Sequence, residues 1–459
     1  MIALALGQLR RRPAAFAGLA VALFLALATV TTFGLLFATE ATAGPDAGEP
    51  VDGPGPMVIA GAFGEIAVLV AFFVVVNALG FALRQQHREL ALLRTVAATP
   101  RQARRLVRAE VVATTLLVAA PGWAAGAAGA RRFLAELQER GMAAPGLRVP
   151  DTVLPMLVAL VALVAVLAVG LAAAAVAARR ISRIAPAAAL TASSTEHDRT
   201  GAPRLLAGAV VLVAGGLLLR LAATRPPGRA DQAGQAALLG SLVLLAAVAL
   251  LGPLAARALA AVSGAPARAL APRAGWLADA NLRGYARRLS SAVVPVALLV
   301  GLSGTMSIMT STAGHAPGAA ASGVTSATDV WLRQSELALL VCFASVSTVN
   351  TLVALTAGRR REFALLRLVG ATGAQLLRML TVEAVLTAVV GVLLGAVVAG
   401  ATSSAYSAAV TGSAVPVVPP AACGWIVAGA TAVTVPVILV TGLRAVRGPA
   451  AELAGGSGD

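Results

Sequence analysis

Ten long stretches almost without charge dominate the sequence and constrain its fold more than any other feature. Each has about 20 residues or more, the length that a helix rising 1.5 Å per residue needs to cross the hydrocarbon core of a bilayer. Only 12% of the residues are charged, against about 25% in an average soluble domain. The sequence therefore predicts an all-α polytopic membrane protein. The predicted spans are 14–38, 57–83, 107–130, 153–178, 204–222, 236–260, 291–311, 335–357, 380–402 and 424–443.

The arginines are distributed unevenly between the two sides of these spans. The N-terminus, the loops near 84–106, 179–204, 257–290 and 358–379, and the C-terminal tail hold 28 of the 36 basic residues. Because positive loops favour the cytoplasmic side of a membrane, we expect a cell-membrane protein with both termini in the cytoplasm. The net charge of +16 then reflects topology, and no nucleic-acid partner is expected.

The chain contains no lysine, since every basic residue is an arginine. A P-loop requires a lysine to bind phosphates, so the chain carries no ATPase motif of that kind. The segment 301–305 resembles a serine elbow but lacks its final glycine, and His87, His197 and His315 lie in separate loops. We therefore predict no catalytic residue, no metal site and no enzyme activity for this chain.

Two segments of the sequence repeat one another at an offset of 273 residues. NALGFALRQQHRELALLRTVAATPRQARRLVRAE (77–110) aligns without a gap with NTLVALTAGRRREFALLRLVGATGAQLLRMLTVE (350–383). Identical polar residues at one fixed offset indicate a duplication of half the chain. An even number of spans separates the copies, which predicts two parallel four-helix repeats plus two linking helices. The predicted domains are 1–200 and 266–459 for the repeats and 201–265 for the linking helices.

Each copy is predicted to form a helix, a break and a second helix within a cytoplasmic loop. Thr99 and Gln102 fit the N-cap and N3 positions of the second helix, and Thr372 and Gln375 repeat them. The first helix is amphipathic, so it either rests on lipid headgroups or docks a protein. Its repeated acidic residue favours protein docking.

The pattern R-E-(F/L)-A-L-L-R-x-V-(G/A)-A-T in both copies resembles the FtsX-like permease domain of the MacB and lipoprotein-releasing type of ABC transporter. In that family this segment is the coupling helix, which rests in a groove of a separate ATPase subunit. The resemblance implies that two ATPase copies dock here and that ATP and Mg²⁺ are bound by the ATPase, with no cofactor bound by this chain. The docking residues that it implies are Arg88, Glu89, Leu92, Leu93 and Arg94 in the first copy and Arg361, Glu362, Leu365, Leu366 and Arg367 in the second.

The order of four, two and four spans is similar to permeases of the bacitracin-resistance type, which carry a large extracellular domain between spans seven and eight. Here the outer loops 39–56 and 312–334 are short and rich in Gly, Ala, Pro and Thr. The resemblance then implies export or extraction of an apolar or amphipathic molecule, such as a lipid, a peptide or an antibiotic. The alternative is a mechanotransmission subunit that controls a cell-wall hydrolase or a sensor kinase.

Two carboxylates lie inside predicted spans. Glu65 and Glu336 are each a few residues into the outer half of equivalent spans. Intramembrane carboxylates are costly and often functional. They either bind a cationic substrate, pair with Arg333, or reach water at the boundary. Neither lies at mid-depth, where an ion-coupled secondary transporter would place its acidic residues.

Small residues and one polar segment give two further local expectations. The pairs Gly122 with Gly126 and Gly391 with Gly395 are predicted to let neighbouring helices approach closely. The segment 131–140, RRFLAELQER, is predicted to form a short amphipathic helix on the outer surface.

Overall fold

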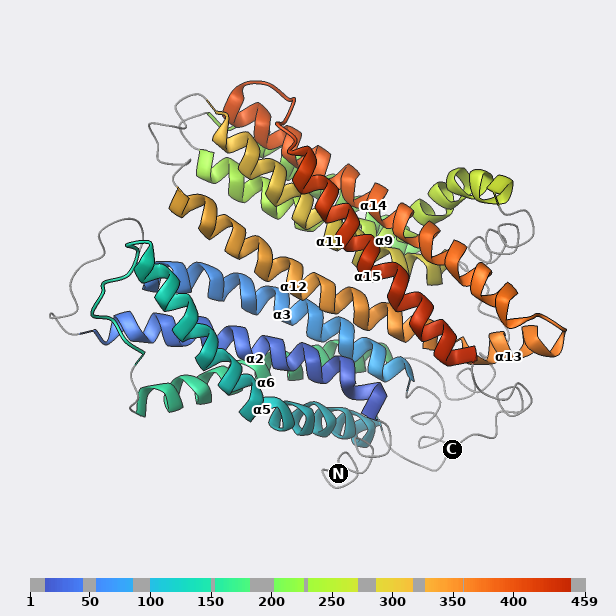
Figure 1. Cartoon of the computed structure of the whole chain (residues 1–459), viewed down its shortest axis with the longest axis horizontal. Helices are drawn as coiled ribbons and strands as arrows, with labels where there is room; N and C mark the ends of the chain where they lie inside the picture. The colour runs from blue at the N-terminus through green and yellow to red at the C-terminus, as the bar shows by residue number, and fades with distance from the viewer. Residues whose placement is uncertain are drawn as a thin grey trace. The chain divides into compact units, whose positions relative to one another are not determined.

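The computed structural model describes residues 13–43, 55–85, 100–149, 153–181, 202–226, 230–270, 286–316, 327–357 and 359–446. Every regular element in these ranges is a helix, as Figure 1 shows. The helices are α2 (Pro13–Ala41), α3 (Pro56–Gln85), α5 (Pro100–Glu139), α6 (Val153–Ile181), α8 (Ala202–Ala223), α9 (Ala230–Leu270), α11 (Ala286–Gly314), α12 (Ala327–Ala357), α13 (Arg360–Leu368), α14 (Gly373–Thr411) and α15 (Pro420–Val446).

Nine of the described helices are long and apolar enough to cross a membrane. The second predicted span is occupied by α3, a helix of 30 residues. The prediction of an all-α polytopic membrane protein is therefore confirmed. The outer segment 131–140 was predicted wrongly, because α5 continues without a break to Glu139 and buries Leu134 and Leu137.

The chain divides into two compact units, Met1–Glu196 and His197–Asp459. The first contains α2, α3, α5 and α6. The second contains α11, α12, α14 and α15, together with α8, α9 and the short α13. The linking helices α8 and α9 pack on each other and on α14, and α9 also packs on α11. The boundaries of the three predicted domains stay predictions.

The duplication is visible in how the helices of each unit pack. In the first unit α2 contacts α3, α5 and α6, and α6 contacts α3 and α5; in the second unit α11, α12, α14 and α15 make the same five pairings. The sequence offset of 273 residues also separates the first residues of α2 and α11, and those of α5 and α14. Each unit therefore repeats one four-helix architecture.

Glycines allow the closest of these helix contacts. A Cβ atom on Gly122 of α5 would lie 2.9 Å from the Leu27 side chain of α2. At the equivalent position in the second unit, a Cβ atom on Gly395 would lie 2.7 Å from Val300 of α11. Since Leu27 and Val300 are themselves one repeat apart, the predicted role of these glycines is confirmed in both units.

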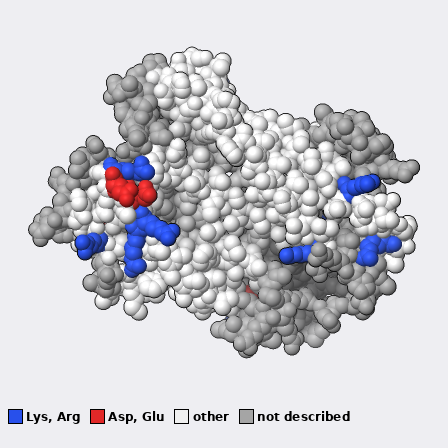
Figure 2. Space-filling model, in the orientation of Figure 1, with Lys and Arg blue, Asp and Glu red and all other residues white. Residues whose placement is uncertain are grey.

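Apolar side chains cover much of the outer surface. On α8 the exposed Leu206, Val210, Val213 and Leu217 follow one another at helical spacing and are each at least 60% exposed. Figure 2 shows a wide uncharged surface, with the described charged side chains gathered in a few patches. Such a surface suits hydrocarbon and would be unfavourable in water.

Candidate functional site

The second copy of the repeated segment forms a short helix between two long ones. The nine-residue α13 begins after Arg359 and ends at Leu368, and α14 starts five residues later. The turn between them passes through Gly370, whose φ of +99° is accessible mainly to glycine. The predicted order of helix, break and helix is confirmed for this copy.

The predicted cap of the second helix is also present. The Thr372 hydroxyl accepts a hydrogen bond from the backbone N–H of Gln375 at 3.3 Å, and the backbone N–H of Thr372 donates to the Gln375 side chain at 2.9 Å. This reciprocal capping box satisfies two N–H groups that the first turn of α14 leaves without helical partners. It therefore fixes where α14 begins.

One face of α13 is built into the second unit. Phe363 is fully buried, and Leu366 packs beside it as a partly buried side chain. Their cluster includes Leu352 of α12, Met379 of α14 and Ile438 of α15. Residues three apart lie on the same face of a helix, so this spacing defines the inner face of α13.

The opposite face of α13 leaves apolar side chains uncovered. Leu365 is 48% exposed, Leu368 is 56% exposed, and Val369 just after the helix is 88% exposed. We call these three residues the α13 tip. Leu368 and Val369 were not among the predicted docking residues. Leu368 corresponds to Thr95 in the first copy, whereas Val369 corresponds to Val96 and is identical.

A buried arginine joins α13 to α14. The Arg359 Nη1 atom lies 2.6 Å from Glu383 Oε1, and its Nε atom lies 3.2 Å from Glu362 Oε2. The guanidinium also lies over the Phe363 ring, 5.0 Å from its centroid. Side-chain exposure is 5% for Arg359, 14% for Glu383 and 39% for Glu362. We call these three charged residues the Arg359 triad.

The carboxylates of the triad keep the arginine charged. Burial of the Arg359 guanidinium by itself lowers its pKa. The charges and hydrogen bonds of Glu383, and then those of Glu362, outweigh this effect, and the pKa of Arg359 lies above its ordinary value. Arg359 is therefore a permanent cation at every physiological pH.

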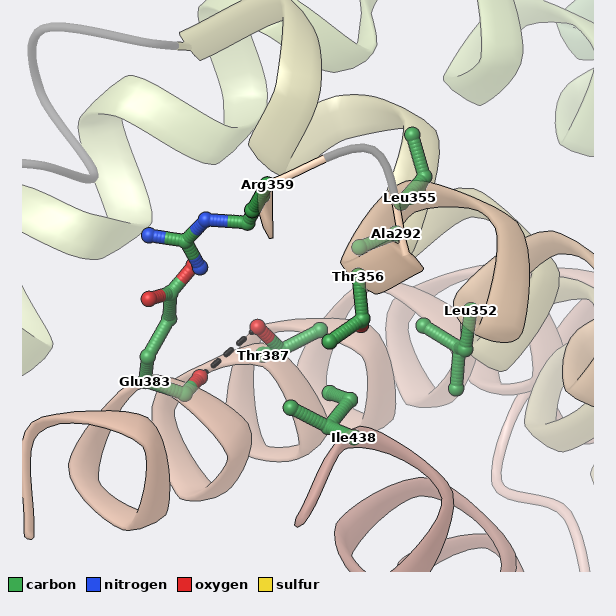
Figure 3. A pocket seen from close by; sticks show the side chains of 8 residues that line it. All are labelled: Ala292, Leu352, Leu355, Thr356, Arg359, Glu383, Thr387 and Ile438. Atoms are coloured by element: carbon green, nitrogen blue, oxygen red, sulfur yellow. Dashed lines mark hydrogen bonds and ion pairs between the residues drawn. The ribbon is translucent and has the colours of Figure 1, made fainter. Parts of the chain in front are cut away.

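A small cavity of about 30 Å³ adjoins the triad, and Figure 3 shows Arg359 and Glu383 pointing toward one another at its edge. Within the described residues, the Glu383 Oε2 atom has no hydrogen-bond partner. A cavity of this size accommodates one or two water molecules. All four long helices of the repeat contribute to its walls. The lining residues are Ala292, Leu352, Leu355, Thr356, Arg359, Glu383, Thr387 and Ile438.

The structure places the described docking residues on different faces of α13. Leu365 faces outward, Leu366 faces the unit's core, and Glu362 pairs with Arg359. Arg367 is partly buried in the last turn. The side chain of Arg361 and the five first-copy residues lie outside the described residues. The roles of all these residues stay predictions.

The two intramembrane carboxylates differ in exposure. Glu65 is exposed on α3, and Glu336 is half-buried on α12. Their helices belong to different units, and the predicted partner Arg333 has no described side chain. Their function stays a prediction.

Each of the two units contains four long helices with the same pairwise contacts. This arrangement of membrane helices defines a polytopic permease with an internal duplication. The profile of the FtsX-like permease C-terminal family matches residues 61–186 and 335–450, one match in each unit and together more than half of the chain. The chain belongs to the FtsX-like permease family, whose members are membrane-spanning subunits of ABC transporters. The predicted family is therefore confirmed. A comparison with curated proteins finds no match.

Proposed function

We propose that this chain couples ATP hydrolysis by a separate ATPase to the export or extraction of an apolar or amphipathic substrate, such as a lipid, a peptide or an antibiotic. The observation that carries the proposal is the geometry of α13. One face of this helix is anchored in the second unit, while the α13 tip presents apolar side chains outside the bundle. The segment that includes residues 88–94 would dock a second ATPase copy on the first unit.

The anchoring of α13 favours protein docking over simple contact with lipid headgroups. An amphipathic helix that lies in the membrane interface without binding a protein needs an apolar face and a charged face. Here the larger apolar residue, Phe363, is committed to the protein core, and Glu362 is held by Arg359. The tip is consequently held in one orientation, as a surface must be to transmit force to a rigid partner.

The described loops at the other end of the helices favour a substrate handled within the bilayer. After α5, the Gln138 side chain donates to the carbonyl oxygens of Ala144 at 3.0 Å and Leu147 at 2.8 Å. After α14, the backbone N–H of Val417 donates to the Thr312 hydroxyl of α11 at 3.1 Å. Both loops therefore fold onto their own helices, which supports a substrate handled among the membrane helices.

The orientation and the nucleotide chemistry complete the proposal. The arginine distribution supports a cytoplasmic location for both termini and both docking segments. ATP and Mg²⁺ would be bound by the ATPase, and this chain would contribute only the surfaces that the ATPase moves.

Co-purification tests the proposal directly. The chain and its ATPase are reconstituted together in lipid nanodiscs, with the double variant Leu92→Asp and Leu365→Asp compared with the natural sequence. We expect the double variant to lose ATPase binding, because each change buries a charge in an apolar contact. The matched control is Val415→Asp, which charges an equally apolar and 77% exposed residue in the loop after α14.

The outcome is read in two measurements. Loss of ATPase binding in the double variant, with binding retained by Val415→Asp, supports docking through the two segments. Retained binding with unchanged ATP-dependent movement of a labelled lipid or peptide would contradict it. A single Leu365→Asp change is expected to weaken binding only in part, because two docking points act together.

A further inference from the structure

We propose that Arg359 is the positioning residue that makes α13 move together with the second unit as one body. The proposal rests on the proposed function, because it describes how the movement of a docked ATPase reaches the membrane helices. Arg359 and Glu362 lie outside the candidate membrane spans, whereas Glu383 lies on α14, which is one of them. The triad therefore joins α13 to a membrane-spanning helix.

The backbone connection to α14 does not provide this coupling. The chain leaves α13 through Gly370. The backbone N–H groups of Gly370 and Ala371 donate to carbonyl oxygens of Arg367 and Leu366, so these bonds hold the turn to the last turn of α13 and not to α14. A push on the α13 tip would be absorbed at this turn unless α13 were held laterally. Phe363 and Leu366 provide non-directional apolar contact, which resists separation better than rotation.

The triad supplies the missing directional restraint. Two different nitrogens of one planar guanidinium engage a carboxylate on α13 and a carboxylate on α14, which fixes both distance and angle. The side chain of Arg359 is 95% buried, so water competes little for these bonds. The Phe363 ring covers one planar face of the Arg359 guanidinium.

Arg359 also lines the cavity at which four helices of the second unit meet. Beside the triad, the cavity is bounded by Ala292 of α11, Thr356 of α12, Glu383 of α14 and Ile438 of α15. Displacement of the guanidinium would therefore disturb all four helices rather than α14 alone. The polar walls and the second oxygen of Glu383 allow a water molecule to complete the network.

The two copies of the repeated segment differ at the position of Arg359. At an offset of 273 residues, Glu383 corresponds to Glu110, which is 1% exposed on α5. Glu362 corresponds to Glu89, whereas Arg359 corresponds to Gln86. The acidic residues are thus present in both copies, while an arginine at this position occurs only in the second copy. Replacing Arg359 is expected to affect the second docking helix alone.

The mobility of the α13 tip tests the proposal without any ATPase. In a chain with Cys342→Ala and Cys423→Ala, a spin label is attached through Val369→Cys, and its electron paramagnetic resonance spectrum is recorded in nanodiscs. We expect Arg359→Gln to raise the mobility of this label, Arg359→Lys to raise it less, and Arg378→Gln to leave it unchanged. Arg378 is the matched control, an exposed arginine of α14 outside the triad.

Two further variants separate positioning from general unfolding. A label attached through Val415→Cys, in the loop after α14, should keep its mobility in Arg359→Gln. The double variant Arg359→Gln with Glu383→Gln removes both buried charges and should fold even where the single variant does not. The proposal would be overturned if the label at residue 369 were as immobile in the double variant Arg359→Gln with Glu383→Gln as it is with the natural residues at both positions.

The complex with the ATPase distinguishes this proposal from the proposed function. In the double variant, binding of the ATPase should be retained, while substrate-stimulated ATP hydrolysis should fall about tenfold, within the range typical of coupling between distant sites. Unchanged stimulation would overturn the positioning role. If the natural chain does not bind the ATPase at all, the proposed function fails, and the label mobilities still decide whether Arg359 holds α13.

Discussion

The two four-helix units have the same helix pairings but different side chains where their third helices, α5 and α14, pack. In the first unit, the ring centroid of Phe133 on α5 lies 5.8 Å from that of Phe33 and 5.9 Å from that of Phe63, and the last two lie 5.4 Å apart. The equivalent residue of α14, Tyr406, packs among alanines of α9. The aromatic cluster of one unit is therefore replaced in the other by contact with a linking helix.

The third helices of the two units, α5 and α14, also differ at other buried positions. Three of the buried hydroxyl residues of α14 occupy positions that are apolar in α5. Thr402, Ser403 and Ser407 correspond to Gly129, Ala130 and Leu134. Helix–helix contact in a bilayer relies on close packing and local hydrogen bonds more than on the hydrophobic effect, so small hydroxyl residues suit a helix with many helical neighbours. The two units therefore share their helix pairings and differ in the side chains of the third helix, where α14 also packs on α8 and α9.

The largest expected difference between the units is at the Arg359 triad. Arg359→Gln gives the second copy the residue of the first, and it leaves Glu383 in a mostly buried position without its cation. We expect a loss of about 3 kcal/mol in the free energy of unfolding, measured by denaturation in detergent micelles. The reciprocal Gln86→Arg change should have a much smaller effect, and equal losses for the two changes would contradict the difference between the copies.

The second prediction concerns the glycines between paired helices. Gly395→Ala would place its Cβ 2.8 Å from the backbone nitrogen of Gly301, whereas Gly122→Ala meets only the flexible side chain of Leu27. Because backbone cannot move aside cheaply, we expect a loss of about 2 kcal/mol for Gly395→Ala and about half of that for Gly122→Ala. Denaturation in detergent measures both.

Gly400→Ala is the control for this pair of changes, since a Cβ atom at Gly400 of α14 meets nothing within 4 Å. It should be neutral or slightly stabilising, because alanine is the better helix former. A loss at Gly400 as large as that at Gly395 would mean that helix propensity, and not close packing, explains the result.

The third prediction uses two hydroxyls of α14. The Ser407 hydroxyl donates to the carbonyl oxygen of Val415 at 3.0 Å, so Ser407→Ala should cost about 1 kcal/mol. The Ser403 hydroxyl has no hydrogen-bond partner among the described residues, and Ser403→Ala, which gives α14 the residue found at Ala130, should be close to neutral. Thermal unfolding of the two variants side by side makes the measurement. The reverse order would show that Ser403 is bonded in the membrane.

The smallest expected effect is at the cap of α14. Thr372→Ala removes the hydroxyl that accepts from Gln375, and an exposed N-cap of this kind contributes about 0.5 to 1 kcal/mol. Hydrogen exchange of the first turn of α14 should rise locally, with the middle of the helix unchanged. Thr372→Ser is the control, because serine caps as well as threonine, and it should restore the natural exchange rate.

Local signals in the sequence were enough to predict much of this fold. Hydrophobic length predicted the ten long helices, and the repeated segment predicted α13 and the Thr372 cap, because caps and spans depend on residues close in sequence. The Arg359–Glu383 pair could not be predicted in this way. Its members are 24 residues apart, one directly before α13 and one on α14, and only the packing of α13 brings them together.

The packing of the linking helices could not be predicted from the sequence either. Both α8 and α9 are apolar enough to predict as spans, but a bilayer and a protein neighbour are both apolar, so hydrophobicity does not tell which surface they cover. The pairing of Glu362 with Arg359 could not be predicted for a related reason. A charged residue in a loop helix is expected to be solvated, and only the structure shows the buried arginine beside it.

The joining of the two copies in one chain has a consequence for how such a protein changes over generations. In a dimer of identical subunits, every substitution appears twice, so both docking helices must tolerate it together. In this chain, Arg359 and Gln86 occupy the same place in the repeat and differ freely. Under the proposed function, each of the two repeated segments could therefore adapt separately to the ATPase copy that docks on it.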